Sequence, residues 1–213
     1  MSKGLKTGTL SYYMQHFFHF LNYCYTSFKN KPINKLTIEE SKALLLASLI
    51  YKKDIDKNIS KLLDLLNIQI DNNGFHKSYN PLQHAEFLNN LYELKNMILF
   101  FEVKVPDKLS FDIVNMSALL MGLLHKDNSL PLFNGANNFF KNEVHKIIRQ
   151  AKDIKAKNLK NINKGIIIYS DKNKKIFMDI VLPTNQIINK NLHSSTLGFE
   201  LSCLDEKIIT ICF

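Results

Sequence analysis

The sequence contains no tryptophan, only three cysteines and a single arginine among its 28 basic residues. Cys24, Cys203 and Cys212 are odd in number and lack metal-ligand spacing, so they predict neither a disulfide framework nor a zinc site. Lysine cannot form the planar two-pronged contacts with which arginine binds bases and phosphates, and the chain has no helix-turn-helix or RNA-binding signature. A nucleic-acid-binding protein is therefore disfavoured.

Long hydrophobic runs are also lacking. No stretch approaches the ~20 uninterrupted apolar residues of a transmembrane helix. The N-terminal apolar region is interrupted by Gln15, His16 and Asn22, and it has no small-residue cleavage site. We therefore expect no membrane insertion and find no signal peptide in this sequence.

What the sequence does contain is typical of a globular protein of one or two domains, with 46% hydrophobic and 22% charged residues. The formal net charge is +9, carried almost entirely by lysine. Such a chain has a diffuse positive field that attracts polyanions. A lysine-rich surface that is simply solvated is the alternative interpretation.

Apolar residues at spacings of three and four predict an all-helical first part. The predicted helices cover Ser11–Phe28, Thr37–Tyr51, Ile55–Ile68, Pro81–Phe101, Pro106–His125 and Asn134–Lys157. The first is so rich in aromatic residues at mixed spacing that we expect it to be buried on more than one side. Thr37 with Glu40 three residues later is a capping-box signature.

The pattern changes to β-strands after Lys157. Strands are predicted over 165–169, 176–181, 197–202 and 207–213, the first two as a hairpin. Helices followed by antiparallel strands indicate an α+β fold, with a helical domain at 1–157 and a β domain at 158–213. The last strand runs to the C-terminus on an open apolar edge, so we expect the chain to be a fragment.

The segment 73–84 is the strongest candidate for chemistry, because it places His76, Tyr79 and His84 between a turn and a helix. Gly74 and the asparagines before it predict the turn, and Asn80 followed by a proline predicts the helix cap. A histidine at this position can also be a capping or core residue without any catalytic role.

Three segments, in the right order, resemble the heparinase II/III family of polysaccharide lyases. Residues 74–84 (GFHKSYNPLQH) are similar to the family's DGGH-x-x-R-x-P-x-Y-H, and 123–136 (LLHKDNSLPLFNGA) to H-x-D-G-x-I-P-L-F-N-D/G-A/S. Residues 193–202 (HSSTLGFELS) resemble H-A-G/D-x-L-S-F-E-L. The resemblance implies part of an incomplete (α/α) toroid followed by the start of an antiparallel β-sandwich.

The resemblance also implies an activity: β-elimination in a uronic-acid-containing polysaccharide, such as a glycosaminoglycan or an alginate-like polymer. Histidine and tyrosine suit the base and the acid of that reaction. The implied catalytic residues are Tyr79, His76, His84 and His193, and the implied substrate-binding residues are Lys77, Gln83 and Asn134. Family members of this kind are typically periplasmic or secreted.

The sequence departs from the family pattern at several positions. The family tyrosine after the proline is Gln83 here, and Tyr79 stands where an arginine is usual. The H-x-H-x-D pattern of many members becomes Asn191, His193 and Ser195, so no metal and no other cofactor is expected. The alternative is therefore a catalytically inactive carbohydrate-binding or structural remnant of the fold. A glycoside hydrolase is disfavoured because no convincing carboxylate pair is present.

Overall fold

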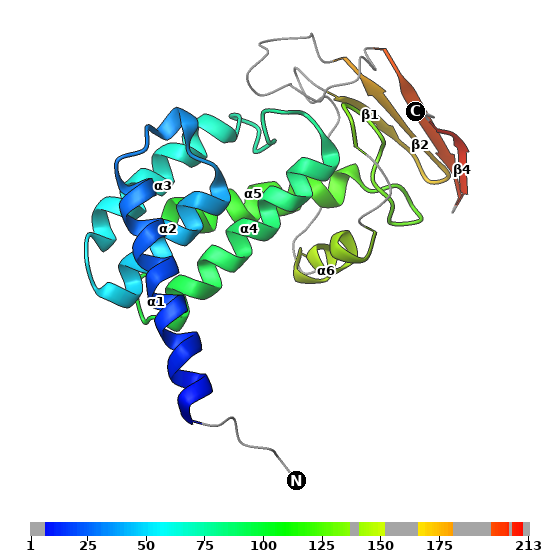
Figure 1. Ribbon diagram of the computed structural model, residues 1–213. Helices are drawn as coiled ribbons and strands as arrows, with labels where there is room; N and C mark the ends of the chain where they lie inside the picture. The colour runs from blue at the N-terminus through cyan, green and yellow to red at the C-terminus, as the bar shows by residue number, and fades with distance from the viewer. Residues whose placement is uncertain (1–6, 137–140, 152–165, 181–196, 205, 211–213) are drawn as a thin grey trace. The chain divides into compact units, whose positions relative to one another are not determined.

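The computed structural model describes residues 7–136, 141–151, 166–180, 197–204 and 206–210 (Figure 1). The helices are α1 (Thr7–Lys29), a short 3-10 helix (Ile33–Lys35), α2 (Ile38–Tyr51), α3 (Ile55–Gln69), α4 (Pro81–Phe100), α5 (Asp107–Leu123) and α6 (Lys141–Ala151). The strands are β1 (Ile166–Ser170), β2 (Lys174–Asp179), β3 (Phe199–Cys203) and β4 (Glu206–Ile209). The predicted α+β class is confirmed.

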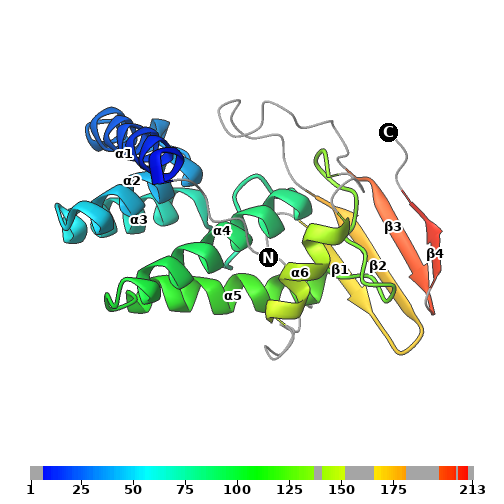
Figure 2. The ribbon, with the colours of Figure 1, turned by 60° about the horizontal axis from the view of Figure 1, so that its bottom comes forward.

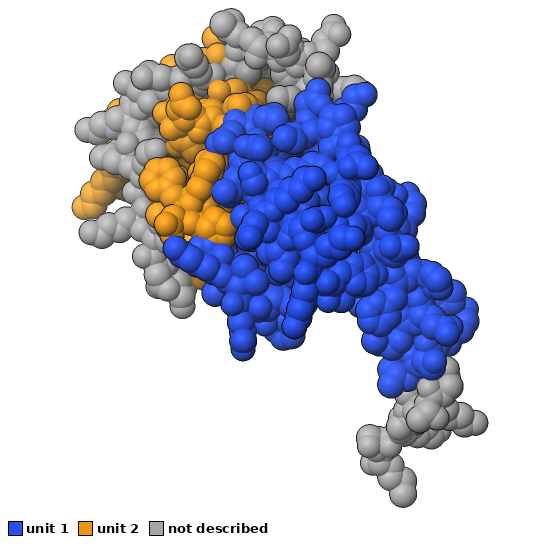
Figure 3. Space-filling view, turned by 90° about the vertical axis from the view of Figure 1, so that its left-hand side faces the viewer, with its two compact units in different colours: residues 1–68, 94–105 blue, residues 69–93, 106–213 orange. Residues whose placement is uncertain are grey.

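The chain divides into two compact units, coloured in Figure 3: residues 1–68 with 94–105, and residues 69–93 with 106–213. Helix α4 contributes to both. The predicted boundary between a helical and a β domain, at 157/158, falls outside the described residues.

In the first unit, α1 packs against α2 through Leu21, Tyr25, Leu44 and Ala47. The capping box predicted at the start of α2 is confirmed: the Thr37 hydroxyl accepts from the Glu40 N–H, and the Glu40 carboxylate accepts from the Thr37 N–H. The side chain of Lys61 on α3 donates to the last carbonyls of α1, where a cation complements the helix dipole.

The burial expected for the aromatic N-terminal segment is wrong for most of its length. Every residue of α1 from Thr9 to Phe20 is exposed, and Tyr13, Phe20 and Tyr23 remain 59–62% accessible. The aromatic content is high, but within the described chain the buried residues of α1 begin only at Leu21. No helix of the described chain is long and apolar enough to cross a membrane.

In the second unit, α4 and α5 lie side by side in both views (Figures 1 and 2). Apolar side chains of both helices are buried. The buried residues of this pair include Leu82, Leu88, Leu91, Leu109, Ile113, Met116, Leu119 and Leu120. The predicted helix start at Asn134 is wrong, because Asn134 (φ +52) and Gly135 (φ +82) adopt left-handed backbone that a helix cannot contain. The described helix begins at Lys141 instead.

The four strands form one antiparallel sheet in the order β1-β2-β3-β4 (Figure 2). The predicted β1–β2 hairpin is confirmed, and its turn is held by the Asp171 carboxylate, which accepts from the N–H groups of Asn173 and Lys174. On β3 alternate residues are buried, and the buried ones are the polar Glu200 and Ser202. A sheet face that buries polar side chains must supply them with partners.

Candidate functional site

The carboxylate of Asp71 organises the turn that precedes α4. Its Oδ1 accepts from the N–H groups of Asn73 (2.9 Å) and Phe75 (2.8 Å), and its Oδ2 accepts from the Tyr79 hydroxyl (3.2 Å). Gly74 has φ +87, and its missing side chain lets the turn approach α5, since an added Cβ would lie 3.1 Å from the Cβ of Asn115. The predicted turn is therefore confirmed, and it is packed rather than loose.

Phe75 is fully buried and stacks with two of the candidate residues. Its ring lies 5.5 Å from the Tyr79 ring and 4.9 Å from the His84 ring, with interplanar angles of 16° and 22°. Such stacking holds the rings in fixed positions relative to one another. The sequence segment 73–84 thus brings Tyr79 and His84 into stacking contact with one phenylalanine.

His84 is completely buried, and both of its ring nitrogens are occupied. The backbone N–H of His76 donates to Nδ1 (3.3 Å), so Nδ1 carries no proton and Nε2–H donates to the Met116 carbonyl (3.0 Å). Burial lowers the pKa of His84 to about 4, and the bond to Met116 only partly opposes this. His84 is therefore neutral near pH 7.

His76 is also buried. Its Nδ1 accepts from the Ser78 backbone N–H (3.3 Å) and lies 2.8 Å from the Ser78 hydroxyl. Its ring leans against Phe87 at 5.0 Å. Burial, with a smaller contribution from His84, lowers the pKa of His76 to about 3. The two histidines therefore stay uncharged across the physiological range.

Tyr79 has left-handed backbone (φ +52), which is unusual for a bulky residue and costs about 1–2 kcal/mol. The conformation is held at both ends: its N–H donates to the His76 carbonyl (2.9 Å), and the Asn134 side chain donates to its carbonyl (3.0 Å). Burial, and then Asp71, raises the pKa of Tyr79 to about 12. The hydroxyl consequently keeps its proton and can act as a donor.

Asn80 confirms the predicted cap of α4, because its side-chain oxygen accepts from the N–H groups of Leu82 (2.8 Å) and Gln83 (3.0 Å). Its amide nitrogen donates to the Asn134 carbonyl (2.8 Å). The Asn134 side chain in turn donates to the Tyr79 carbonyl. Two hydrogen bonds of opposite direction therefore join the start of α4 to a loop more than fifty residues later.

The remaining predicted residues are distributed differently. Gln83 is half-buried in the first turn of α4, and Lys77 is half-buried beside the Ile70–His76 bridge, with its N–H donating to the Gln69 carbonyl. His193 lies outside the described residues. The structure thus gathers His76, Tyr79, Gln83, His84 and Asn134 around the start of α4.

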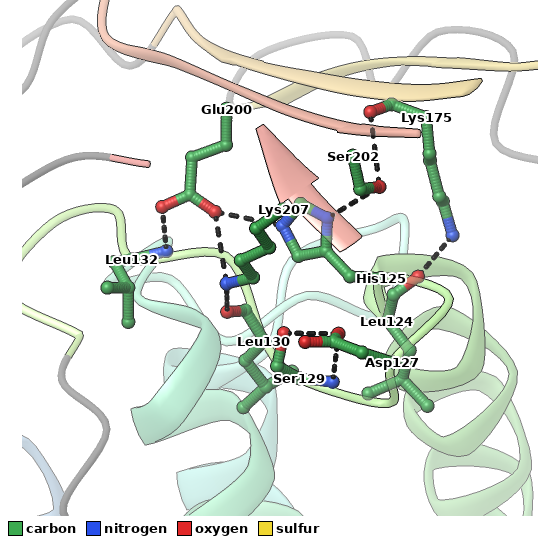
Figure 4. A network of polar contacts seen from close by, with 10 residues as sticks. All are labelled: Leu124, His125, Asp127, Ser129, Leu130, Leu132, Lys175, Glu200, Ser202 and Lys207. Carbon is green, nitrogen blue, oxygen red and sulfur yellow. Dashed lines mark hydrogen bonds and ion pairs between the residues drawn. The ribbon is translucent and has the colours of Figure 1, made fainter. Parts of the chain in front are cut away.

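A second polar network, which the sequence analysis did not single out, surrounds His125 (Figure 4). His125 Nε2 lies 2.8 Å from Oε2 of Glu200, and its Nδ1 lies 3.0 Å from the Ser202 hydroxyl. Oε1 of Glu200 accepts from the Leu132 N–H (2.9 Å), and the Lys207 ammonium lies 3.4 Å from Oε2. Glu200 is completely buried and has a partner for each oxygen.

The protonation state of this network follows from its partners. Burial would raise the pKa of Glu200, but the hydrogen bond from His125 and the charge of Lys207 bring it below its ordinary value. Burial lowers the pKa of His125 in spite of Glu200. Glu200 is therefore ionised, and neutral His125 donates to it from Nε2 while accepting from Ser202 at Nδ1.

Ser202, His125 and Glu200 follow the order of a serine-histidine-acid triad, but they do not form a nucleophilic site. Both Ser202 and His125 are 2% exposed, so a substrate cannot reach the hydroxyl. The network instead joins β3 to the loop after α5. Two signals in the sequence point to it: His125 and Glu200 both lie in motif segments, and the β3 alternation places Glu200 and Ser202 on one face.

No group of three histidine, cysteine or acidic side chains in the described part of the chain is arranged to hold a metal ion.

No family model and no curated protein matches the sequence. Solved structures do match. Heparan sulfate lyase HepC from Pedobacter heparinus aligns over 98% of this chain with a TM-score of 0.66 and 16% identity. A heparinase III with methylated lysines aligns over 96% (TM-score 0.67, 14% identity), and another heparinase III structure over 81% (TM-score 0.62, 15% identity). This chain shares its fold with part of these heparinase III structures.

The alignments cover 37%, 35% and 34% of those solved chains, so this sequence spans about a third of a heparinase III fold. The fold implied by the three motif segments is confirmed at the level of helices followed by an antiparallel sheet. The finer assignment to a toroid and a sandwich stays a prediction.

Proposed function

We propose that this chain is part of a polysaccharide lyase that cleaves a uronic-acid-containing glycosaminoglycan by β-elimination. The observation that carries the proposal is the heparinase III fold shared along almost the whole chain with a heparan sulfate lyase. Heparan sulfate is therefore the first substrate to test. The net charge of +9 suits a polyanion of this kind.

The reaction sets specific demands. A base removes the proton at C5 of the uronate, the electron pair forms the C4–C5 double bond, and the C4–O bond breaks. An acid then protonates the departing oxygen. The C5 proton is weakly acidic until the neighbouring carboxylate is neutralised, so amide or cationic donors are needed beside it.

In this proposal Tyr79 is the proton donor. A hydroxyl whose pKa is raised to about 12 keeps its proton at neutral pH, and Asp71 orients it. Left-handed backbone at a tyrosine that is held by Asp71, His76 and Asn134 is the kind of strain that accumulates at functional sites. The same pKa disfavours Tyr79 as the base in the unliganded chain.

His76, His84 and His193 are the proposed histidines of the site. His76 and His84 are neutral and therefore able in principle to accept a proton, but a substrate would have to displace packed neighbours to reach them. Within this proposal they hold Tyr79 and the helix cap in place, and His193 is the better candidate for the base. Lys77, Gln83 and Asn134 are the proposed substrate contacts.

A second candidate function is carbohydrate binding without catalysis. Gln83 favours it, because this amide occupies the place of the family tyrosine and cannot exchange a proton at neutral pH. The occupied ring nitrogens of His84 favour it as well.

The test combines binding and elimination. Wild-type chain, Tyr79→Phe and Tyr92→Phe would be compared for heparan sulfate binding by calorimetry and for the ultraviolet absorbance of the unsaturated uronate. Tyr92→Phe is the matched control, since it removes a half-buried hydroxyl that bonds Ser117 on α5. We expect Tyr79→Phe to lower the elimination rate by roughly 100-fold or more and Tyr92→Phe to leave it within about 2-fold.

If the wild-type chain binds heparan sulfate without any change in absorbance, non-catalytic carbohydrate binding replaces elimination as the proposed function. Equal rates in wild type and Tyr79→Phe would remove Tyr79 from the reaction. If neither binding nor elimination occurs with heparan sulfate, hyaluronan or alginate in a chain shown to be folded, both candidate functions fail for this chain.

A further inference from the structure

The loop of residues 124–136, here called the connecting loop, is tied to the rest of the second unit at two separate places. Its first half contacts the sheet, and its last residues contact the start of α4. Both sets of contacts are buried or partly buried hydrogen bonds between residues far apart in the sequence.

At the sheet, the contacts come from one face of three strands. Lys175, Ser202 and Lys207 are cross-strand neighbours in register, and Phe177 is the neighbour of Glu200 in the adjacent row. Figure 4 shows the side chains of Lys175, Glu200, Ser202 and Lys207 pointing toward the connecting loop. Lys207 donates to the Leu130 carbonyl (3.0 Å), and Lys175 donates to the Leu124 carbonyl.

The most constrained point is Leu132. Its N–H donates to Oε1 of Glu200, while Oε2 of the same carboxylate is held by His125 and Lys207. A carboxylate is needed for this arrangement because all three partners are donors. The carboxylate therefore fixes the backbone of the connecting loop at Leu132.

Two residues after Leu132, the loop reaches the candidate site. Phe133 between them is completely buried, and Asn134 makes the reciprocal bonds with Tyr79 and Asn80. The left-handed backbone at Asn134 aims its side chain at the Tyr79 carbonyl. A shift of the loop at Leu132 must therefore change the support of Tyr79.

We propose that Glu200, together with His125 and Lys207, is a positioning residue for Tyr79, acting through Leu132 and Asn134. The effect of this positioning on catalysis rests on the proposed lyase function, whereas the structural link between β3 and the start of α4 does not.

The first test is independent of any activity: amide hydrogen exchange of the full chain, read by mass spectrometry, in wild type, Glu200→Gln and Glu206→Gln. A glutamine at 200 has one donor group and one acceptor, so it must turn its NH2 toward either the Leu132 N–H or His125 and Lys207. Glu206→Gln, an exposed position on the neighbouring strand, is the control.

We expect Glu200→Gln to speed exchange at least about 10-fold in peptides covering 130–136 and also in those covering 78–84, and Glu206→Gln to change neither. Faster exchange confined to β3 and 130–133, with 78–84 unchanged, would overturn the proposal. If Glu200→Gln does not fold, Lys207→Gln keeps the His125–Glu200 pair and removes the contact with Leu130. Amide exchange in the peptides covering 130–136 and 78–84 is then measured in Lys207→Gln, where we expect a smaller increase in both.

The second test concerns catalysis. In a wild-type chain that eliminates heparan sulfate, Glu200→Gln should lower kcat at least about 10-fold because the donor is misplaced. KM should rise by less than this, because only Asn134 of the proposed substrate contacts lies on the displaced loop. Combining it with Asn134→Ala should give little further loss if both act along one path. If the double variant instead lowers kcat by the product of the two separate effects, Glu200 and Asn134 do not act along one path. If the wild-type chain has no activity, the lyase proposal fails. The structural link between β3 and the start of α4 is then judged from the amide exchange alone.

Discussion

At the scale of single residues, the start of α4 is held by side chains that a sequence motif marks as catalytic. His84 joins the turn to α5 through His76 and Met116, and Phe75 stacks with the rings of both His84 and Tyr79. These motif residues therefore pack the start of α4 against α5. A buried neutral histidine of this kind makes folding depend on pH.

We expect the free energy of unfolding to fall as the pH decreases from about 6.5 toward 4, with His84 contributing on the order of 3 kcal/mol. The sign follows from a folded-state pKa below the unfolded one: the unfolded chain binds the proton first, so stability is complete above the unfolded pKa and is lost as pH falls. Urea unfolding at several pH values measures it. His76, with a pKa of about 3, adds to the same slope.

His84→Gln should reduce the slope of the free energy of unfolding against pH by the equivalent of roughly one bound proton. An amide can replace both ring contacts but does not titrate. His145→Gln is the control, since His145 is exposed on α6. An unchanged slope in His84→Gln would mean that His84 is not buried in its neutral form.

The candidate site was predictable from the sequence only in part. The turn, the Asn80 cap and the proximity of His76, Tyr79 and His84 follow from local chemistry within a dozen residues. The roles of Asn134 and Glu200 do not, because they depend on contacts across 55 and 75 residues of chain. Side-chain burial, which sets each pKa, likewise depends on tertiary packing.

At the scale of elements, helix periodicity and caps located α2, α3, α4 and α5 to within a few residues. The two errors have clear physical reasons. Left-handed backbone at Asn134 delays the start of α6, and the aromatic face of α1 has no cover within the described chain. Local propensity carries no information about which neighbours are available to a helix.

The end of α5 depends on a strand residue. The Lys175 ammonium donates to the carbonyls of Gly122 (2.8 Å) and Leu124 (2.5 Å), and its burial lowers its pKa to about 8. We expect Lys175→Met to destabilise the fold by about 1–3 kcal/mol in urea unfolding at neutral pH, because two buried carbonyls lose a charged donor.

Lys174→Met is the matched control for this prediction. Lys174 is the preceding residue on β2, is exposed, and should change stability by less than about 0.5 kcal/mol. Equal effects of the two substitutions would show that Lys175 does not support the helix end.

At the scale of the whole molecule, the chain contains a segment of a heparinase III fold in which the candidate site and the sheet belong to one compact unit. Exposed aromatic residues on α1, such as Tyr13 and Phe20, offer surface for further packing. The fold alone does not decide between elimination and simple binding, since both use the same scaffold.

The most direct test of the lyase proposal is the chemical form of the product. Heparan sulfate would be incubated with the full chain, and the products analysed by mass spectrometry. The proposal predicts oligosaccharides with an unsaturated uronate at one end, each lighter by one water than the product of hydrolysis, because elimination breaks the C4–O bond without adding water. Saturated products that have gained a water, or no products from a folded chain that binds the polymer, would contradict it.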